Sequence, residues 1–320
     1  MESVQSLIKS LEDDAQFMSC VTRWERIEAR EGSYAALPDD LDPQIRSALE
    51  KRGIDRLYSH QAESYRAARA GEDFVVVTPT ASGKTLCYNL AVLQSIIETP
   101  ESRALYLFPT KALSQDQQAE LNESVMAGEL PVKIVTYDGD TPVSLRVSAR
   151  DKGQIVISNP DMLHAGVLPN HPKWIKFLRN LEYVVIDEVH TYRGIFGSHM
   201  TNLIRRIKRI AAFYGSDPTF ICCSATIGNP GELAARIVEK PMTLIDRNGA
   251  PSGEKHLVLY NPPLVDRVQG IRRGVVNESQ KLALRFLRAG TKTIVFSRSR
   301  VRTELIASYI NKSLANIYNE

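Results

Sequence analysis

The sequence predicts an α/β fold in which a parallel sheet carries helices on both faces. Short apolar runs rich in Val, Ile, Phe and Tyr recur along the chain, and stretches with helical periodicity separate them. Several runs are apolar throughout, as expected for parallel strands that are covered on both sides. The predicted strands are Phe74–Val77, Ala104–Phe108, Lys133–Tyr137, Ile155–Ile157, Tyr183–Ile186 and Thr219–Cys223, with a seventh far downstream at Thr293–Phe296.

Local signals mark the helices around these strands. Asp42 and Pro43 provide an N-cap and a first-turn proline, and Gly53 ends that helix. Ser59 is predicted to cap a second helix that ends at Gly71. A third helix carries a core-facing stripe with helical spacing, formed by Leu86, Leu90, Leu93 and Ile97.

Composition bounds the class of protein. The chain has 320 residues, 43% hydrophobic and 24% charged, and its net charge of +3 is compatible with many functions. Its start does not resemble a signal peptide and no apolar run approaches the roughly 18 residues of a membrane span, so we predict a cytoplasmic protein without membrane contact. The four cysteines lack C-x-x-C spacing, which disfavours a zinc site, and Cys222 and Cys223 are predicted to be reduced and buried.

The strongest local signal is TPTASGKT at residues 78–85, between a predicted strand and an amphipathic helix. This is the setting of a phosphate-binding loop, in which backbone N–H groups and a helix N-terminus face the phosphates. We expect Lys84 to contact the β- and γ-phosphates of ATP and Thr85 to bind Mg²⁺. A surface turn is the simpler alternative. The other loop residues expected at the nucleotide are Thr80, Ala81, Ser82 and Gly83.

The second signal is LEYVVIDEVH at residues 181–190, an apolar strand that ends in two acidic groups. Ligands bind at the carboxyl ends of strands in open α/β sheets. We expect Asp187 to hold Mg²⁺ and Glu188 to orient and deprotonate the attacking water. A strand that merely ends in an acidic turn is the alternative, and the phosphate loop upstream disfavours it.

Residues 187–190 read DEVH, a variant of the DEAD/DEAH box. In this segment the chain resembles superfamily 2 helicases of the DEAD/DEAH-box type, whose motor domains are RecA-like. The resemblance extends to Ser224, Ala225 and Thr226, a triplet that couples nucleotide state to nucleic-acid grip, with His190 as its hydrogen-bonding partner. The segment TYRGIFGSHM after the DEVH box narrows the resemblance to DNA helicases of the MrfA type, the bacterial mitomycin-repair helicases, and their fungal RecQ-like relatives.

The same resemblance implies an adenine site upstream of the phosphate loop. Gln61 is similar to the glutamine that reads adenine in these motors, since its amide can donate to N7 and accept from N6. Tyr58 is expected to stack on the base, with Leu57 and Tyr65 as alternatives. An exposed helix position for Gln61 and core packing for Tyr58 stay open.

A nucleic-acid track is implied at three further strand ends, in FPTKALSQDQ, YDGDT and SNPDMLH. Contacts of this kind hold a sugar–phosphate backbone without reading its sequence. The residues expected to line the track are Thr110, Lys111, Gly139, Asp140, Asn159 and Pro160. Four basic residues of a later helix are better explained as a solvated face: Arg205, Arg206, Lys208 and Arg209.

Four segments are expected along the chain. A helical N-terminal segment (1–55) precedes a RecA-like ATP-binding domain (56–245), a polar linker (246–255) and the beginning of a second RecA-like domain (256–320). The last segment falls short of the roughly 100 residues of a complete domain. The later motifs of the family, including its arginine finger, are not in this sequence, so we expect this chain to bind nucleotide but to hydrolyse ATP poorly.

The resemblance implies an ATP-dependent DNA helicase that translocates 3′ to 5′ on single-stranded DNA or a 3′-tailed duplex and serves DNA repair. Composition and spacing give neither the polarity nor the choice of DNA over RNA. An RNA-directed or remodelling ATPase with the same motor is one alternative. A nucleotide-dependent binding module without turnover is another, which the intact Lys84, Asp187 and Glu188 disfavour.

Overall fold

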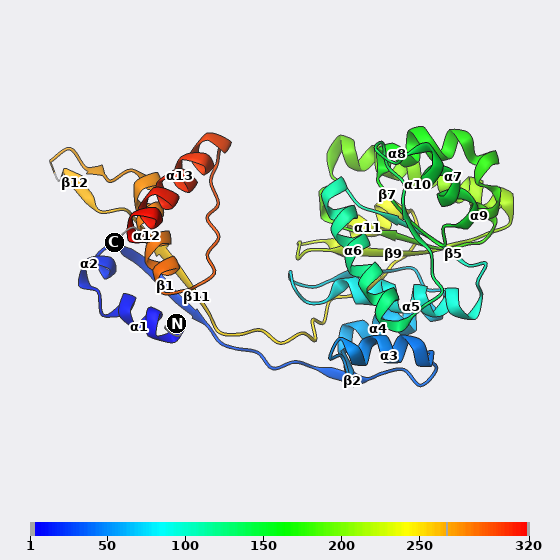
Figure 1. Ribbon diagram of the computed structural model, residues 1–320, viewed down its shortest axis with the longest axis horizontal. Helices are drawn as coiled ribbons and strands as arrows, with labels where there is room; N and C mark the ends of the chain where they lie inside the picture. The colour runs from blue at the N-terminus through cyan, green and yellow to red at the C-terminus, as the bar shows by residue number, and fades with distance from the viewer. Residues whose placement is uncertain (1–3, 267, 319–320) are drawn as a thin grey trace. The chain divides into compact units, whose positions relative to one another are not determined.

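The computed structural model describes residues 4–266 and 268–318, and the chain forms two compact units (Figure 1). The larger unit comprises Glu31–Ser252. The smaller unit combines the N-terminal segment up to Arg30 with the residues from Gly253 onward. None of the described helices has the length and apolarity needed to cross a bilayer.

A seven-stranded sheet forms the centre of the larger unit, with the order β10-β4-β9-β8-β5-β7-β6 and every neighbouring pair parallel. The six strands predicted in this region are confirmed to within two residues at their ends, because their apolar side chains are buried on both faces. The strands are β4 (Phe74–Val77), β5 (Arg103–Leu107), β6 (Ile134–Thr136), β7 (Ile155–Ser158), β8 (Leu181–Ile186), β9 (Thr219–Ser224) and β10 (Thr243–Ile245), the last of which was not predicted.

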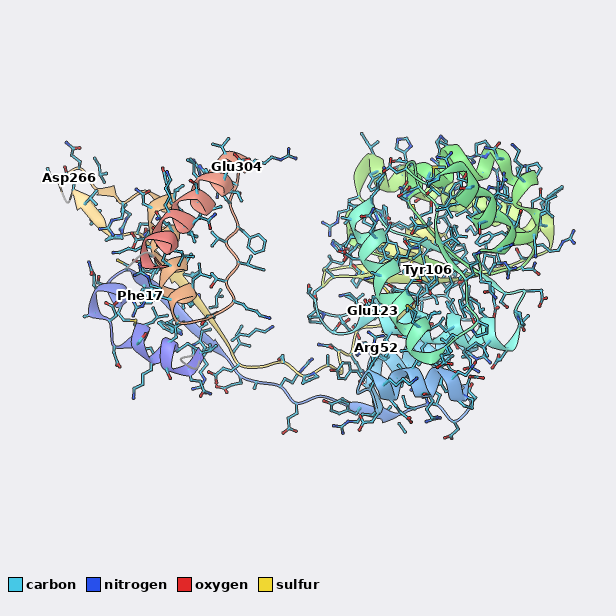
Figure 2. The ribbon with its side chains drawn as sticks, viewed as in Figure 1. Phe17, Arg52, Tyr106, Glu123, Asp266 and Glu304 are labelled. Carbon is cyan, nitrogen blue, oxygen red and sulfur yellow. The ribbon has the colours of Figure 1, made fainter. Side chains whose placement is uncertain are left out.

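Helices cover both faces of this sheet (Figure 1), and each face has its own apolar core. Neighbouring strand residues alternate between the two cores, so Val76 belongs to one and Val75 to the other. Tyr106, labelled in Figure 2, lies in the first core. That core packs under α3 (Pro43–Lys51), α4 (Ser59–Arg69), α5 (Lys84–Glu98) and α6 (Lys111–Gly128). The second lies under α7 (Val143–Lys152), η1 (Leu163–Val167), η2 (Leu168–Trp174), α9 (Ile175–Arg179), α10 (Gly194–Tyr214) and α11 (Pro230–Val238).

The predicted helix signals are confirmed at α3, where the Asp42 side chain accepts from the Gln44 N–H at 2.8 Å. At α4 the prediction is wrong by one residue, since Ser59 is the first helical residue and Tyr58 is the N-cap. Gln61 explains the difference, because its side-chain oxygen accepts the Tyr58 backbone N–H at 2.9 Å and so ties down the start of the helix.

The smaller unit corrects the expectation of a helical segment over residues 1–55. Helices α1 (Val4–Glu12) and α2 (Ala15–Met18) lead into strand β1 (Val21–Ile27), which pairs antiparallel with β11 (Lys255–Tyr260). Phe17, labelled in Figure 2, stacks on Tyr260 with 5.1 Å between ring centroids. The larger unit adds β2 (Tyr34–Ala36), paired with β3 (Arg56–Tyr58). Strand β1 was missed because its partner lies more than two hundred residues away in the sequence.

The rest of the smaller unit contains a short antiparallel pair, β12 (Leu264–Asp266) and β13 (Ile271–Arg272), and the helices α12 (Val275–Arg288) and α13 (Arg300–Tyr318). The strand predicted at Thr293–Phe296 is wrong, because no described segment pairs with these residues. Without a neighbour, an extended segment gains no ladder hydrogen bonds, and the side chain of Phe296 is left 91% exposed.

Candidate nucleotide site and nucleic-acid track

Three sequence motifs meet at one edge of the larger sheet. Strand β9 lies between β4 and β8, and all three run parallel. The phosphate loop follows β4, the acidic pair follows β8, and Ser224 closes β9. The carboxyl ends of these strands therefore place the three motifs side by side.

The phosphate loop is held by its own lysine. The Lys84 amine donates to the carbonyl oxygens of Thr78 at 2.9 Å and Pro79 at 3.1 Å. Ser82 is buried, and its hydroxyl lies 2.6 Å from that of Thr78. Gly83, at φ 74°, is the N-cap of α5. Ala81 has a left-handed φ of 62°, where a side chain is rarely tolerated. Charged phosphate oxygens are stronger acceptors than the two carbonyls and can take over the lysine.

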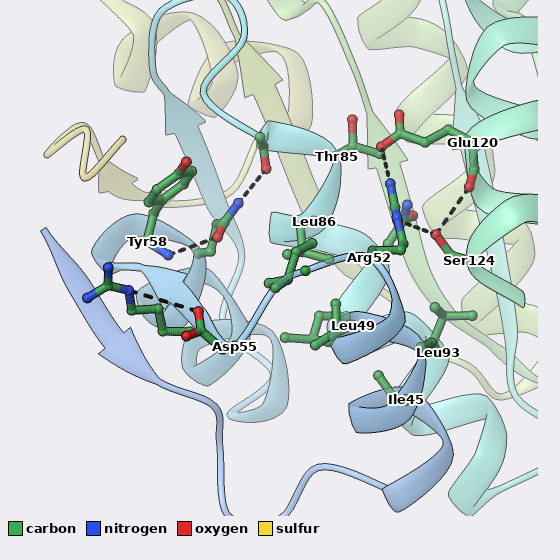
Figure 3. Close-up of a pocket in the computed structure, with 18 of the residues that line it drawn as sticks. Ile45, Leu49, Arg52, Asp55, Tyr58, Thr85, Leu86, Leu93, Glu120 and Ser124 are labelled. Atoms are coloured by element: carbon green, nitrogen blue, oxygen red, sulfur yellow. Dashed lines mark hydrogen bonds and ion pairs between the residues drawn. The ribbon is translucent and has the colours of Figure 1, made fainter. Parts of the chain in front are cut away.

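Gln61 joins the phosphate loop to the start of α4. Its amide donates to the Gly83 carbonyl at 3.0 Å while its oxygen holds the Tyr58 N–H (Figure 3). Both bonds leave one N–H and one lone pair free for a base. The alternative that Gln61 occupies an exposed helix position is excluded, because the residue is buried.

Tyr58 and Gln61 line a cavity of about 440 Å³ that continues between α3, α5 and α6. Tyr34 stands beside Tyr58, with ring centroids 5.5 Å apart, and the Arg56 guanidinium lies 3.7 Å over the Tyr34 ring. Figure 3 shows the apolar side chains of Leu49 and Leu86 in the same cavity. An aromatic wall and a partly free amide suit a planar base such as adenine.

His60 is a site residue that the sequence analysis missed. It is fully buried, its Nε2 lies 3.1 Å from the Ser82 carbonyl, and its Nδ1 accepts the Gly249 N–H at 3.1 Å. Nδ1 is therefore the acceptor and Nε2 carries the proton that it donates to Ser82. Burial lowers the pKa of His60, and the charge of Lys84 lowers it further. His60 and Gln61 thus each donate a hydrogen bond to a carbonyl of the phosphate loop, at Ser82 and Gly83.

Gly249 shows that the predicted linker over residues 246–255 is anchored in its first part. A side chain at this position would meet the Ser59 hydroxyl at 2.3 Å and the Ser33 carbonyl at 2.7 Å. The Gly249 carbonyl accepts the Ser33 N–H at 2.8 Å, and Ala250 is buried. The Gly- and Pro-rich composition therefore reflects close backbone packing as well as a connection.

The acidic pair ends β8 in a constrained turn. Asp187 accepts the backbone N–H of Glu188 at 2.8 Å, and Glu188 itself has a left-handed φ of 53°. Burial raises the pKa of Asp187 to about 6, while the nearby charge of Lys84 acts in the opposite direction. Glu129 and Glu239 share this conformation as helix C-caps, whereas Glu188 has it directly after a buried strand.

Thr85 and Asp187 suit a hydrated Mg²⁺ that also binds phosphate. No group of three or more His, Cys, Asp or Glu that could enclose a metal occurs among the described residues. Mg²⁺ in nucleotide sites takes one or two protein oxygens and completes its shell with water and phosphate. A buried carboxylate whose charge is poorly compensated favours such a cation. When bound, the ion would neutralise phosphate charge.

His190 connects the acidic pair to the end of β9. Its Nδ1 accepts the Ala225 N–H at 3.2 Å and lies 3.2 Å from a carboxylate oxygen of Glu188. One nitrogen can serve only one of these partners: without a hydrogen Nδ1 accepts from Ala225, and in the tautomer with a hydrogen on Nδ1 it would donate to Glu188. The Ser224 hydroxyl donates to the Ala225 carbonyl at 2.9 Å, and Thr226 is exposed.

The other predicted residues gather at the ends of β5, β7 and β6, which are neighbours in the sheet. Lys111 and Asp140 are exposed and form an ion pair at 2.5 Å, and Gly139 lies beside the lysine amine. Thr110 caps α6 by accepting the Leu113 N–H at 3.4 Å. The structure therefore brings the first two loops of the expected track together.

Buried groups shape these loops. Asp138, which the sequence analysis did not single out, accepts the Asp140 N–H and the Thr141 hydroxyl, both at 2.9 Å. The Asn159 side chain accepts the Met162 N–H at 2.8 Å. Pro160 is buried, so it sets the direction of the backbone and does not present a side-chain surface.

A phosphate loop, an acidic pair and a histidine-linked third strand end, all at one edge of a parallel sheet, define a RecA-like nucleotide-dependent motor domain. The chain belongs to the DEAD/DEAH box helicase family, whose profile matches residues 58–233.

Similar proteins agree with this family. The chain is 54% identical over 311 residues to the ATP-dependent helicase YprA of Bacillus subtilis, covering 97% of this chain and 41% of that protein. It is 35% identical to the ATP-dependent helicase HRQ1 of Saccharomyces cerevisiae, over 99% of this chain and 29% of that protein. A crystal structure of the helicase MrfA bound to DNA and AMPPNP matches with 54% identity and a TM-score of 0.92, over 97% of this chain and 43% of that chain. The chain thus spans less than half the length of these relatives.

Proposed function

We propose that this chain is the ATP-binding part of a DNA helicase that couples ATP hydrolysis to movement along single-stranded DNA. The observation that carries the proposal is the arrangement at one sheet edge: Lys84 lies near enough for its charge to act on Asp187, and contacts lead from Glu188 to His190 and on to Ala225. It links a phosphate loop to the strand ends where nucleic acid is expected.

At the nucleotide, Gln61 and Tyr58 would bind the base, and Lys84 with the loop N–H groups would bind the phosphates. Asp187 and Thr85 would hold Mg²⁺. Glu188, fixed by its strained backbone, would orient the attacking water and accept its proton.

The residues at the ends of β5, β6 and β7 would form the nucleic-acid track: Thr110, Lys111, Gly139, Asp140, Asn159 and Pro160. The coupling element would be Ser224, Ala225 and Thr226 at the end of β9. His190 is the physical link between the two ends, because its hydrogen bond to Ala225 depends on the geometry beside Glu188. Loss of the γ-phosphate would alter that geometry and hence the grip on the strand.

The preference for DNA rests on the similarity to MrfA, which was crystallised with DNA. The 3′-to-5′ direction and a role in repair are part of the proposal and rest on family resemblance alone. Location in the cytoplasm likewise stays a prediction.

The test uses a form of the protein that extends to the length of its relatives. ATP hydrolysis should rise with single-stranded DNA and much less with RNA of the same length, and a 3′-tailed duplex should be unwound in preference to a 5′-tailed one. Stimulation by RNA alone would replace the DNA helicase by an RNA-directed motor. Absence of hydrolysis under all conditions would favour a binding module.

A further inference from the structure

The basic residues of α10 divide into two groups with different surroundings. Arg205 donates to both carboxylate oxygens of Glu239, at 2.7 and 2.5 Å, and Lys208 donates to the Val238 carbonyl at 2.6 Å. These two residues bind the C-terminal end of α11. The solvated face expected from the sequence is present, since all four basic residues line one open surface hollow, but two of them also bind α11.

Arg206 and Arg209 lie on the side of α10 that borders η1 and η2. Arg206 contacts the His164 ring nitrogen at 2.8 Å. The Arg209 side chain is exposed and makes no hydrogen bond or ion pair with the described part of the chain. Together with His171 and Phe213, the two arginines line an open groove of about 390 Å³. This groove carries positive charge that no neighbouring carboxylate neutralises.

The segments around the groove are predominantly basic. Residues 160–180 and 194–214, which include α9, α10, η1 and η2, contain seven lysines and arginines and a single acidic residue, Asp161. Phe213 is 77% exposed at the end of the groove, although burial of a phenylalanine is normally favourable. Cations beside an exposed aromatic ring are the combination with which proteins bind single-stranded nucleic acid.

The groove borders the segment that follows the expected track in the chain. Asn159 and Pro160 stand at the end of β7, and the chain runs directly from them into η1, which carries His164. Only four residues separate Asn159 from His164, about 7 Å along a helix. From Arg206 to Phe213 the path follows α10 for about 10 Å more.

We propose that His164, Arg206, Arg209 and Phe213 form a second contact surface for single-stranded DNA, which holds the strand where it leaves the track. The arginines neutralise backbone phosphates and Phe213 stacks on a base. The inference rests on the proposed DNA-binding function and extends it to a face of the domain remote from the nucleotide loop. It predicts a longer binding site than the three strand ends provide.

The test compares Arg206→Gln/Arg209→Gln with a control of equal charge change, Lys51→Gln/Arg66→Gln, on the helices that cover the opposite face. Binding of labelled oligothymidines of about 8 and about 30 nucleotides is measured against salt concentration. Loss of two phosphate contacts should weaken binding of the long strand by about ten-fold and reduce its salt slope by about 1.4. Phe213→Ala should weaken the long strand by about five-fold or more without changing the slope.

Affinity for the short strand, AMPPNP binding and the melting temperature should stay at the wild-type values, which separates lost contacts from misfolding. Equal long-strand binding by the test and control pairs would overturn the inference while leaving DNA binding intact. If neither this chain nor the form extended to the length of its relatives binds either strand, the proposed function itself fails. A polyglutamate peptide is the remaining probe: if the arginine pair loses that peptide but keeps DNA, the surface serves an acidic protein partner and the inference is wrong.

Discussion

The two ends of the functional sheet edge are built in opposite ways. At the nucleotide end, His60, Gln61 and Asp187 are buried or nearly so, and each has a defined hydrogen-bond partner in the loop or turn beside it. At the end proposed for nucleic acid, Lys111 and Asp140 are exposed and form an ion pair with each other. The side chains at the first end are held in place by hydrogen bonds before a ligand binds. Those at the second end are exposed and can exchange their ion pair for other partners.

The difference follows from what each ligand demands. A nucleotide that must react needs groups held in place before it arrives, since misplacement of a catalytic group sharply reduces rate. A strand that must slide needs contacts that are individually weak and independent of sequence. Substitutions at the two ends should therefore differ in size and in the property that they change.

The largest effect is expected for Glu188→Gln, which removes the proposed base but keeps the shape of the side chain. General-base assistance is worth about 10²–10⁴ in rate, so DNA-stimulated ATP hydrolysis should fall by about 10³ in a form that carries the later motifs. AMPPNP binding should persist. Rates equal to wild type would remove Glu188 from its assigned role.

Gln61→Ala should lower nucleotide affinity by about ten- to a hundred-fold, because it removes both the base contact and the tie to the Gly83 carbonyl. The preference for ATP over GTP should shrink as well, which competition titration would measure. Gln44→Ala, at an exposed position of α3, is the control and should leave both quantities unchanged. An undiminished preference for ATP would assign recognition of the base to another residue.

At the open end, Lys111→Ala should lower the affinity for single-stranded DNA by about five-fold. Asp140→Asn should raise that affinity by a smaller factor, because the lysine is released from its ion pair. AMPPNP affinity should not respond to either change. Salt titrations of binding would measure both effects, with Lys51→Ala as the control on α3. If both substitutions weakened binding equally, the ion pair itself would be the binding element.

The smallest effect concerns His60 and pH. Because its pKa is lowered from 6.5 in the folded protein, protonation favours the unfolded chain. Its contribution to stability is complete above about pH 6.5 and declines as the pH falls below that value. Between pH 7.5 and 5.5, the melting temperature of the wild type should therefore fall further than that of His60→Gln. His199→Gln, at an exposed position, should behave like the wild type, and equal pH dependence in all three proteins would contradict the prediction.

Much of the nucleotide site was predictable because its motifs are local. A Gly-Lys-Thr turn between a buried strand and a helix has few other uses, so Lys84 and Thr85 were predicted from neighbours in the sequence. His60 was not, since its role depends on Gly249, which lies 189 positions away. Asp138 was likewise hidden, because a buried loop carboxylate looks like any surface aspartate in a sequence.

The strand prediction shows the same boundary. Strands that are apolar on both faces, such as β4 and β9, can be predicted from composition, because strands buried on both sides need apolar residues at every position. Strand β1 is mostly polar and has no two-residue alternation, and its pairing partner β11 is distant in the sequence. Thr293–Phe296 has the composition of a strand but no described neighbour. Composition tells whether a segment suits a sheet, and pairing decides whether it joins one.

The sequence by itself determined the parallel α/β fold, the phosphate loop and the acidic pair, because short-range chemistry and burial dictate those residues. Only the tertiary structure decided that His60 ties the phosphate loop to Gly249, that His190 stands between Glu188 and Ala225, and that α10 splits its arginines between α11 and an open groove. Each of these outcomes depends on which distant segments approach one another, and a linear pattern carries no record of that approach.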